Sequence, residues 1–189
     1  MTNKKTLDCI KDSSILINLA AEHKDNVQPI SKYDFVNIQG AKNLCEIARE
    51  KRIKTIIFLS SVAIYGFADP NTDEDGSPNY FNDYGRTKHL AEKEYIKWYR
   101  ESPNERNLII IRPTVIFGEG NRGNVYNLIE QIAKKRFIMF GDGLNSKSMA
   151  YVENVADFIQ YVIKRNIKGF KKFNYVDKPD LTMNKLTIL

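Results

Sequence analysis

The sequence predicts an α/β protein with a doubly wound parallel sheet. Three short apolar runs rich in isoleucine alternate with longer segments whose apolar residues recur at helical spacing. Continuous apolar runs are typical of parallel strands buried on both faces, and their alternation with helices favours a parallel sheet covered on both sides. The 189 residues, 42% of them apolar, are enough to bury one sizeable core.

The first half of the chain alternates strand and helix. The run from Ile15 to Ala20 ends in small residues and predicts a buried strand. Between Asp34 and Lys51, apolar residues recur every three or four positions, which predicts a helix. Thr55 to Leu59 is the second predicted strand. After a loop at 69–82, rich in Asp, Asn, Pro and Gly, we expect a long helix over 82–100.

The second half continues the alternation. Leu108 to Arg112 predicts a third strand, which Pro113 stops because proline cannot donate to a sheet ladder. The remaining predicted elements are a helix at 125–135, a short strand at 137–140, a helix at 153–165 and a strand at 173–176.

A tyrosine and a lysine lie four residues apart in the long helix. Tyr84 and Lys88 therefore share one helix face, where the lysine ammonium can favour the ionised phenol. Ser61, at the end of the second strand, supplies a hydroxyl. A phenol with a pKa of about 10 needs a cation and a hydrogen-bond donor before it can accept a proton at neutral pH. The pattern predicts Tyr84 as a general base assisted by Lys88 and Ser61.

Charge and cysteine content narrow the possible partners. The formal charge is +6, but basic residues are interleaved with acidic ones, which is typical of solvated helix faces and favours small anionic substrates over nucleic acid. Cys9 and Cys45 are isolated, which indicates a reducing cytoplasm. Neither histidine has a partner at ligand spacing, so we expect no metal site. No apolar run approaches membrane-spanning length, so we expect no membrane partner.

Five motifs follow one another between residues 15 and 178. They are Asn18-Leu19-Ala20-Ala21, Asn37-Ile38-Gln39-Gly40, Ser60-Ser61-Val62-Ala63-Ile64-Tyr65-Gly66, Tyr84 with Lys88, and Ile111-Arg112-Pro113-Thr114-Val115-Ile116-Phe117-Gly118. Together they resemble the extended short-chain dehydrogenase/reductase family, in particular its nucleotide-sugar epimerases and dehydratases. The resemblance implies a Rossmann-like fold, with a partial NAD-binding domain at 1–122 and a partial substrate-binding lobe at 123–189.

The resemblance also implies a set of site residues. Ser61, Tyr84 and Lys88 correspond to the family's catalytic residues. The implied NAD-binding residues are Leu19, Ala20, Ala21, Ser60, Tyr84, Lys88, Pro113 and Thr114. Ser61, Asn124 and Lys147 would bind the substrate. Lys147 stands where the family usually has an arginine, and a lysine keeps the charge but loses the two-pronged contact with a diphosphate.

The residues after Ser61 separate two family activities. Family dehydratases carry an Asp-Glu pair there, whereas this chain has Val62 and Ala63, which cannot act as acid and base. The resemblance therefore favours an NAD-dependent 4-epimerase of a nucleotide-linked sugar, such as a UDP-hexose used in surface polysaccharide synthesis. It further implies a cytoplasmic homodimer formed through the helices at 34–51 and 84–100.

The chain departs from the family pattern at its start. The family begins with a strand, a Gly-rich turn and a helix that hold the cofactor pyrophosphate, but this chain has no glycine before Gly40. We therefore expect that the first 50 to 60 residues or so of the family pattern are missing, since one strand-helix-strand unit takes about 30 or more. The C-terminal lobe also stops early. On this basis the chain alone should bind NAD weakly or not at all.

Three alternatives remain open. The chain could be a catalytically silent remnant that binds a nucleotide sugar or associates with itself. It could instead be a keto-sugar reductase that consumes NADPH. Finally, the segment from Gly118 to Gly123 spells the dinucleotide fingerprint between a strand and a helix, with Asp142 about 20 residues later. The family order assigns that loop to the substrate side. The sequence does not identify the sugar or decide between NAD and NADP.

Overall fold

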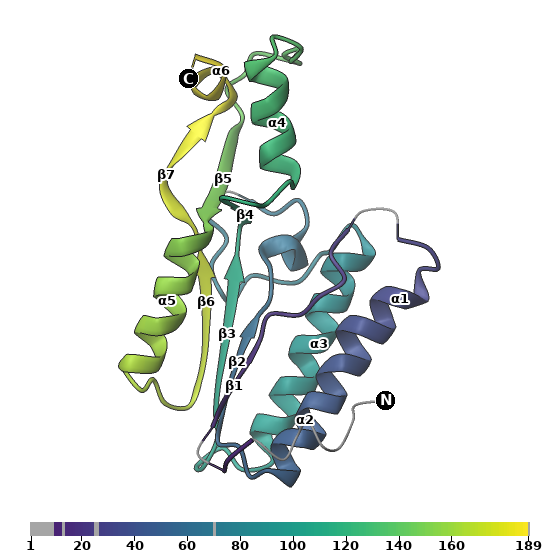
Figure 1. The fold of residues 1–189 in the computed structure, drawn as a ribbon, viewed down its shortest axis with the longest axis vertical. Coiled ribbons are helices and arrows are strands. Elements are labelled where there is room, and N and C mark those ends of the chain that lie inside the picture. The colour runs from purple at the N-terminus through teal and green to yellow at the C-terminus, as the bar shows by residue number, and fades with distance from the viewer. Residues whose placement is uncertain (1–9, 13, 25–26, 70, 189) are drawn as a thin grey trace. The chain divides into compact units, whose positions relative to one another are not determined.

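The computed structural model describes residues 10–12, 14–24, 27–69 and 71–188 (Figure 1). Two compact units make up the chain. The first comprises Met1–Arg112 with Asn166–Asn174, and the second comprises Pro113–Arg165 with Tyr175–Leu189. The sequence-based division by function, at 122/123, lies later in the chain than this structural division. Cys9 lies outside the described residues.

The first unit is built on a four-stranded sheet. Its strands are β1 (Ile15–Asn18), β2 (Thr55–Leu59), β3 (Asn107–Pro113) and β6 (Phe170–Tyr175), in the order β1-β2-β3-β6. β1 and β3 both run parallel to β2, and their residues pair in continuous register. The predicted α/β fold with a Rossmann-like parallel sheet is confirmed. In register, these three parallel strands end at the same edge of the sheet.

Long helices pack against this sheet in the first unit. The helical segment predicted at 34–51 spans α1 (Ser31–Tyr33), a π-helical stretch η2 (Asp34–Gln39) and α2 (Gly40–Glu50). Tyr84 and Lys88 lie on α3 (Asp83–Arg100), and a short 3₁₀ turn, η3 (Val62–Tyr65), follows β2. Among the described residues, no helix is both long and apolar enough to cross a membrane.

The main core lies between α2, α3 and one face of β2 and β3. Trp98 and Tyr95 from α3 are fully buried there. The other members of this core are Ala41, Cys45, Ala48, Ile53, Ile56, Phe58, Ala91, Leu108 and Ile110. Small residues on α2, such as Ala41 and Ala48, leave room for the large rings of α3. Since aromatic side chains bury the most surface, these two rings anchor α3 to the sheet.

The predicted burial of β1 on both faces was wrong. We expected β1 to be buried on both faces, but Ile15 and Ile17 are 39% and 41% exposed. Leu16, which points to the opposite face, packs against the core. β1 is an outer strand of the described sheet, so its second face lacks the neighbours that cover an inner strand. The sequence run was apolar on both faces and gave no sign of this difference.

The second unit contains a three-stranded sheet. β4 (Val115–Phe117) runs parallel to β5 (Ser146–Tyr151), which pairs antiparallel with β7 (Asp177–Thr182). The helices of this unit are α4 (Asn124–Ala133), α5 (Val152–Lys164) and α6 (Met183–Ile188). The predicted helices at 125–135 and 153–165 are therefore confirmed.

Strand predictions in the second unit were less successful. No strand forms at 137–140, where Ile138 and Phe140 are exposed instead of packed in a sheet. β4 and β5 were missed because β4 is very short and β5 begins with polar residues. The single strand expected at 173–176 overlaps the last three residues of β6, which ends at Tyr175, and β7 begins after it at Asp177.

Candidate active site

The end of β1 is shaped by one buried amide side chain. Asn18 accepts a hydrogen bond from the Ala20 backbone N–H at 3.0 Å and donates to the Tyr95 hydroxyl at 2.7 Å. The chain is therefore turned at Leu19 and Ala20, which the resemblance assigns to the cofactor. Sequence analysis noted Asn18 only as part of a motif. Its structural role is to tie the strand end to α3.

A second asparagine holds the next part of this segment. Asn37, in η2, accepts from the Glu22 backbone N–H at 2.8 Å and donates to the Glu22 carbonyl at 3.1 Å. Its amide also donates to the Thr87 hydroxyl on α3 at 2.9 Å. The segment after Ala21 is thus fixed to both helices. Through Asn37, the motif at 37–40 thus fixes the segment that directly follows the predicted cofactor residues at 19–21.

The side chains of Ser61 and Tyr84 lie near enough for the serine hydroxyl to lower the pKa of the phenol. Ser61 is the N-cap of η3, and its Oγ accepts a hydrogen bond from the Ala63 backbone N–H at 3.1 Å. A serine oxygen that already accepts in this way still has its own proton to donate. Tyr84 lies in the first turn of α3, next to the N-cap pair formed by Asn82 and the Gly85 N–H at 2.8 Å.

The pKa of Tyr84 is raised, whereas the sequence predicted that Lys88 would lower it. Burial raises the pKa of the phenol, and the hydrogen bond with Ser61 lowers it by less. The expected lowering by Lys88 required the ammonium to lie beside the phenol, but this ammonium is held by a carbonyl of β2. In this structure, therefore, the phenol is the stable form of Tyr84.

Lys88 is a buried cation that contacts no acidic side chain among the described residues. Only 2% of the residue is exposed, and Nζ donates to the Leu59 carbonyl at 2.6 Å. Nζ also lies 4.2 Å from the centroid of the Phe58 ring. Burial lowers the pKa of Lys88 to about 7, with a smaller opposing effect from Glu92. A buried ammonium has three protons to donate, so Lys88 retains donors for a ligand.

Ser60 offers a further unused polar atom. Its Oγ is buried and has no hydrogen-bond partner among the described residues. Its backbone N–H donates to the Ile111 carbonyl at 2.7 Å, which fixes the residue at the end of β2. Buried polar atoms are usually hydrogen-bonded, so an unpaired hydroxyl at a sheet edge suits a ligand. Ser60 and Lys88 therefore fit the predicted contacts with a cofactor.

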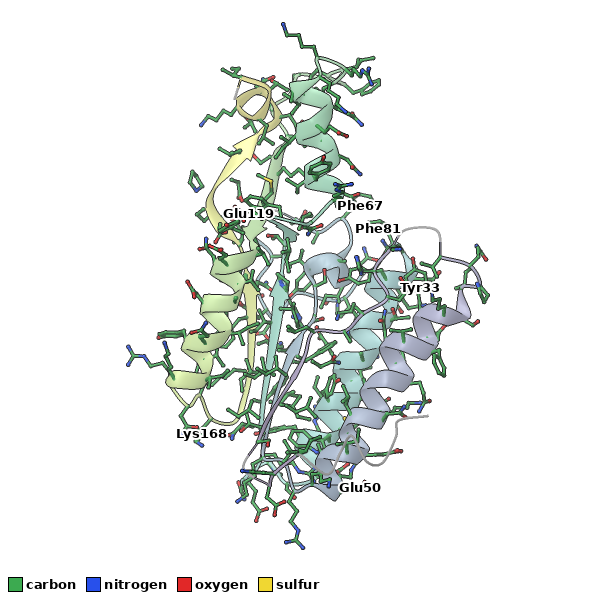
Figure 2. All side chains as sticks on the ribbon, viewed as in Figure 1. Tyr33, Glu50, Phe67, Phe81, Glu119 and Lys168 are labelled. Carbon is green, nitrogen blue, oxygen red and sulfur yellow. The ribbon has the colours of Figure 1, made fainter. Side chains whose placement is uncertain are left out.

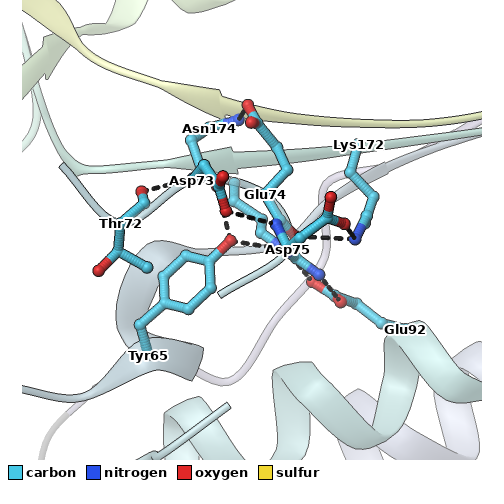
Figure 3. A network of polar contacts seen from close by, with 9 residues as sticks. Tyr65, Thr72, Asp73, Glu74, Asp75, Glu92, Lys172 and Asn174 are labelled. Carbon is cyan, nitrogen blue, oxygen red and sulfur yellow. Dashed lines mark hydrogen bonds and ion pairs between the residues drawn. The ribbon is translucent and has the colours of Figure 1, made fainter. Parts of the chain in front are cut away.

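Behind these residues lies a polar network that sequence analysis did not identify (Figure 3). Arg112, from β3, forms a two-pronged ion pair with Glu92 of α3, at 3.0 and 2.7 Å. Arg112 also donates to the Tyr65 hydroxyl at 2.5 Å and to the Glu74 carbonyl at 3.0 Å. The Tyr65 hydroxyl in turn donates to Asn174 at 2.9 Å. No signal in the sequence linked these distant residues.

The network extends to the loop that precedes α3. Lys172 donates to the Glu74 carbonyl at 2.7 Å and to Asp75 at 2.8 Å. The Asn174 backbone N–H donates to the Glu74 carboxylate at 2.7 Å. The described residues of the loop between η3 and α3 form no helix or strand, yet these contacts hold the loop against β3 and β6 within the first unit.

The remaining predicted residues belong to the second unit. Pro113 ends β3, and the Thr114 N–H that follows it donates to the Tyr175 carbonyl at 2.9 Å. Asn124 is the exposed first residue of α4, and Lys147 lies in β5. The segment from Gly118 to Gly123 joins β4 to α4. Within the described ranges, no cluster of three metal-ligating side chains occurs.

Comparison with known proteins now decides the family. A sequence model of the NAD dependent epimerase/dehydratase family matches residues 1–175. The chain belongs to this family. The predicted resemblance to this family is confirmed.

Two curated relatives are similar over most of this chain. The N-acetyl-alpha-D-glucosaminyl-diphospho-ditrans,octacis-undecaprenol 4-epimerase of Escherichia coli O157:H7 is 53% identical over 171 residues, which cover 90% of this chain and 52% of the relative. The UDP-glucose 4-epimerase of Vibrio cholerae is 28% identical over 160 residues, covering 79% and 48%. The chain thus spans about half the length of these relatives.

A solved structure supports the same fold. The UDP-glucuronic acid 4-epimerase from Bacillus cereus, in complex with NAD, superposes with a TM-score of 0.81 at 22% identity. The match covers 96% of this chain and 59% of that structure. At this identity the likeness bears on the fold alone.

Proposed function

We propose that this chain carries the catalytic residues of an NAD-dependent 4-epimerase that acts on a sugar joined to its carrier by a diphosphate. The observation that carries the proposal is the placement of Tyr84 beside Ser61 and one helical turn from the buried Lys88, whose Nζ is held at the end of β2 by the Leu59 carbonyl. The three residues lie where the parallel strands of the first unit end, which is where open α/β sheets bind ligands.

Tyr84 would take the proton of the sugar hydroxyl at the carbon that is inverted. Ser61 can donate its proton either to the tyrosine oxygen or to the substrate hydroxyl, because its own oxygen already accepts from Ala63. Bound NAD would supply reversible hydride acceptance from that carbon. Tyr84 would return the proton when the hydride comes back on the other face of the sugar.

The cofactor would be held by residues at the sheet edge. Lys88 has protons left for a ribose hydroxyl, and Ser60 has an unpaired hydroxyl. The other proposed cofactor contacts are Leu19, Ala20, Ala21, Tyr84, Pro113 and Thr114. Binding of a hydroxyl by Lys88 would favour its charged form, and a charged Lys88 would oppose the effect of burial on the pKa of Tyr84.

Asn124 and Lys147 are the proposed contacts for the substrate diphosphate. The carrier has two candidates. The UDP-sugar predicted from the sequence agrees with the name of the Vibrio cholerae relative, whereas the 53% identical relative is named for a sugar on diphospho-undecaprenol. Both carriers present the same sugar-diphosphate group to Tyr84. The proposal includes a role in surface polysaccharide synthesis and a cytoplasmic location.

A homodimer through the two long helices is part of the proposal. Phe35, on η2, is largely exposed. An open groove of about 960 Å³ beside it is lined in part by Ile38 and Lys42. An exposed ring in a groove along predicted contact helices supports an interface between copies. Light scattering on the full chain and on Phe35→Asp tests this, with a loss of mass expected for the variant.

The test of the catalytic proposal is a direct assay of epimerisation. The full chain is incubated with NAD and, separately, with UDP-N-acetylglucosamine and N-acetylglucosaminyl-diphospho-undecaprenol. The sugar is then released and its 4-epimers are separated. We expect Tyr84→Phe to lower the rate by about 10²- to 10⁴-fold, the usual contribution of a general base. Tyr99→Phe removes a hydroxyl from the same helix and serves as the matched control.

Each result has a clear meaning. Full activity of Tyr84→Phe would remove Tyr84 from the mechanism. Consumption of NADPH in proportion to product would identify a reductase instead. Calorimetric titration with NAD addresses the expected weak binding by this chain, and micromolar affinity would show that the chain holds the cofactor without the expected Gly-rich turn.

A further inference from the structure

Two exposed phenylalanine rings stack at the loop end of the first unit. Phe67 is 88% exposed and Phe81 is 60% exposed. Their centroids are 4.8 Å apart and their planes are inclined by 22° (Figure 2). Single exposed apolar residues are common on protein surfaces, but a contiguous apolar surface points to a contact. We call this pair the aromatic platform.

The backbone that carries Phe67 is fixed by a close approach. Gly66 has a φ of +63°, and a Cβ at this position would lie 1.9 Å from the Asn79 carbonyl oxygen. The Asn79 N–H donates to the Ile64 carbonyl at 2.9 Å. Only glycine allows this contact, so the segments that bear Phe67 and Phe81 are held together by their main chains.

A second close approach fixes the platform relative to the catalytic residues. A Cβ on Gly85 would lie 2.4 Å from the Ala63 carbonyl oxygen and 3.0 Å from the Tyr80 Cβ. The first turn of α3, which carries Tyr84, therefore rests directly on the turn that begins at Ser61. The platform, Ser61 and Tyr84 belong to one packed group, and Phe81 precedes Tyr84 by three residues.

The position of Phe81 is not explained by packing against α3, the helix that follows it. It directly precedes the N-cap Asn82, a position where an apolar residue often packs on the fourth helical residue. That residue is Arg86, which forms ion pairs with Asp34 and Asp83. Phe81 stacks on Phe67 instead and stays largely exposed, so packing within α3 does not explain it.

We propose that the aromatic platform binds the polyprenyl chain of a lipid-linked sugar diphosphate while Tyr84 acts on the sugar. This inference rests on the proposed function and assigns the carrier. Isoprene units are apolar and flexible, so they gain free energy by covering ring faces that water otherwise contacts. Because Phe81 precedes Tyr84 by three residues on one packed segment, the platform would meet a carrier that extends from the sugar diphosphate.

The name of the 53% identical relative supports this occupant over others. A UDP carrier ends in a polar ribose and a uracil, whereas a polyprenol continues for many apolar units past the diphosphate. Uracil could also stack on a ring. The test therefore has to separate a lipid chain from a base.

The experiment measures two affinities on the full chain. The probes are farnesyl-diphospho-N-acetylglucosamine, a short prenyl-linked sugar, and UDP-N-acetylglucosamine. The variant is Phe67→Ser/Phe81→Ser. We expect its Kd for the prenyl-linked sugar to rise about tenfold, equivalent to about 1.4 kcal/mol, while its Kd for UDP-N-acetylglucosamine stays the same. Phe140→Ser removes a ring that is 87% exposed in the second unit and should change neither value.

The two proposals fail in different ways. If the wild type epimerises a sugar diphosphate but the double variant binds the prenyl-linked sugar normally, the platform is not the lipid site and the proposed function stands. Equal weakening of both ligands, or selective weakening of UDP-N-acetylglucosamine, would also overturn the lipid assignment. A lower mass of the variant in light scattering would assign the rings to a contact between copies. If the wild type epimerises neither compound, the proposed function fails and the inference with it.

Discussion

Two deeply buried charged groups in the first unit are treated in opposite ways. Arg112 uses three of its nitrogens on Glu92, Tyr65 and the Glu74 carbonyl. Lys88, similarly buried and one turn before Glu92 on α3, donates to a single carbonyl and has no acidic side chain in contact among the described residues. Both arrangements place a cation in a low-dielectric interior. Hydrogen-bond donors that remain unused, more than burial, therefore distinguish a binding site from a structural network.

Removing the carboxylate that pairs with Arg112 should have the largest effect on stability. Glu92→Leu leaves the Arg112 guanidinium buried without its carboxylate, and we expect a loss of about 3–5 kcal/mol in the free energy of unfolding. Urea denaturation of the full chain measures it. Glu94→Leu, which removes an exposed ion pair with Lys97 on the same helix, is the control and should cost less than about 1 kcal/mol. Equal losses in both variants would contradict the comparison.

Replacing Lys88 should change the free energy of unfolding in the opposite direction. Lys88→Met removes a buried cation whose charge is disfavoured, so we expect a gain on the order of 2 kcal/mol at pH 7 together with loss of epimerisation. The pKa of Lys88 is about 7 in the folded chain and about 10.5 when unfolded. Between these values the unfolded state binds more protons, so the wild type gains stability as pH rises.

The variant lacks this pH dependence. The difference in unfolding free energy between Lys88→Met and wild type should therefore shrink from pH 7 to pH 9. Other titrating groups contribute alike to both proteins and cancel. A difference that stays constant over this range would mean that Lys88 keeps an ordinary pKa.

A smaller loss of stability is expected when the polar network around Arg112 loses the Tyr65 hydroxyl. Tyr65→Phe removes the hydroxyl that accepts from Arg112 and donates to Asn174. We expect a loss of about 1–2 kcal/mol, because a buried charged donor loses one acceptor but keeps Glu92. Tyr161→Phe, at an exposed position on α5, is the control. Unchanged stability in Tyr65→Phe would show that water replaces the hydroxyl.

The smallest effect on stability should come from Ser60→Ala. Its Oγ has no partner among the described residues, so its removal should change the free energy of unfolding by less than about 0.5 kcal/mol. Affinity for NAD, measured by calorimetry, should nevertheless fall several-fold if Ser60 binds the cofactor. A marked loss of stability would mean that the hydroxyl has a structural partner.

The sequence predicted well where periodicity and burial agree. β2 is found at the predicted residues, and α3 begins within one residue of the expected 82–100. These elements have strong apolar patterns and pack against each other in the core. Ser61, Tyr84 and Lys88 could be proposed as site residues from the sequence because Ser61 follows β2 and the other two lie one turn apart on α3.

Other features depend on contacts that a linear pattern does not contain. The network around Arg112 joins residues as far apart as Glu74 and Asn174. The exposure of β1 depends on its place in the sheet, and the pKa of Tyr84 depends on how deeply the phenol is buried. The strand β5 escaped notice because polar residues begin it. In each case the deciding factor is a neighbour distant in sequence.

The path of the chain through its two units has a consequence for biosynthesis. β6, which lies beside β3 in the sheet of the first unit, comes after the long excursion Pro113–Arg165 into the second unit. A growing polypeptide therefore exposes the edge of β3 on the ribosome until the whole excursion has been translated. An open strand edge can pair with a neighbouring chain. Translational pauses within 113–165 should thus be the moments when this protein most needs a chaperone.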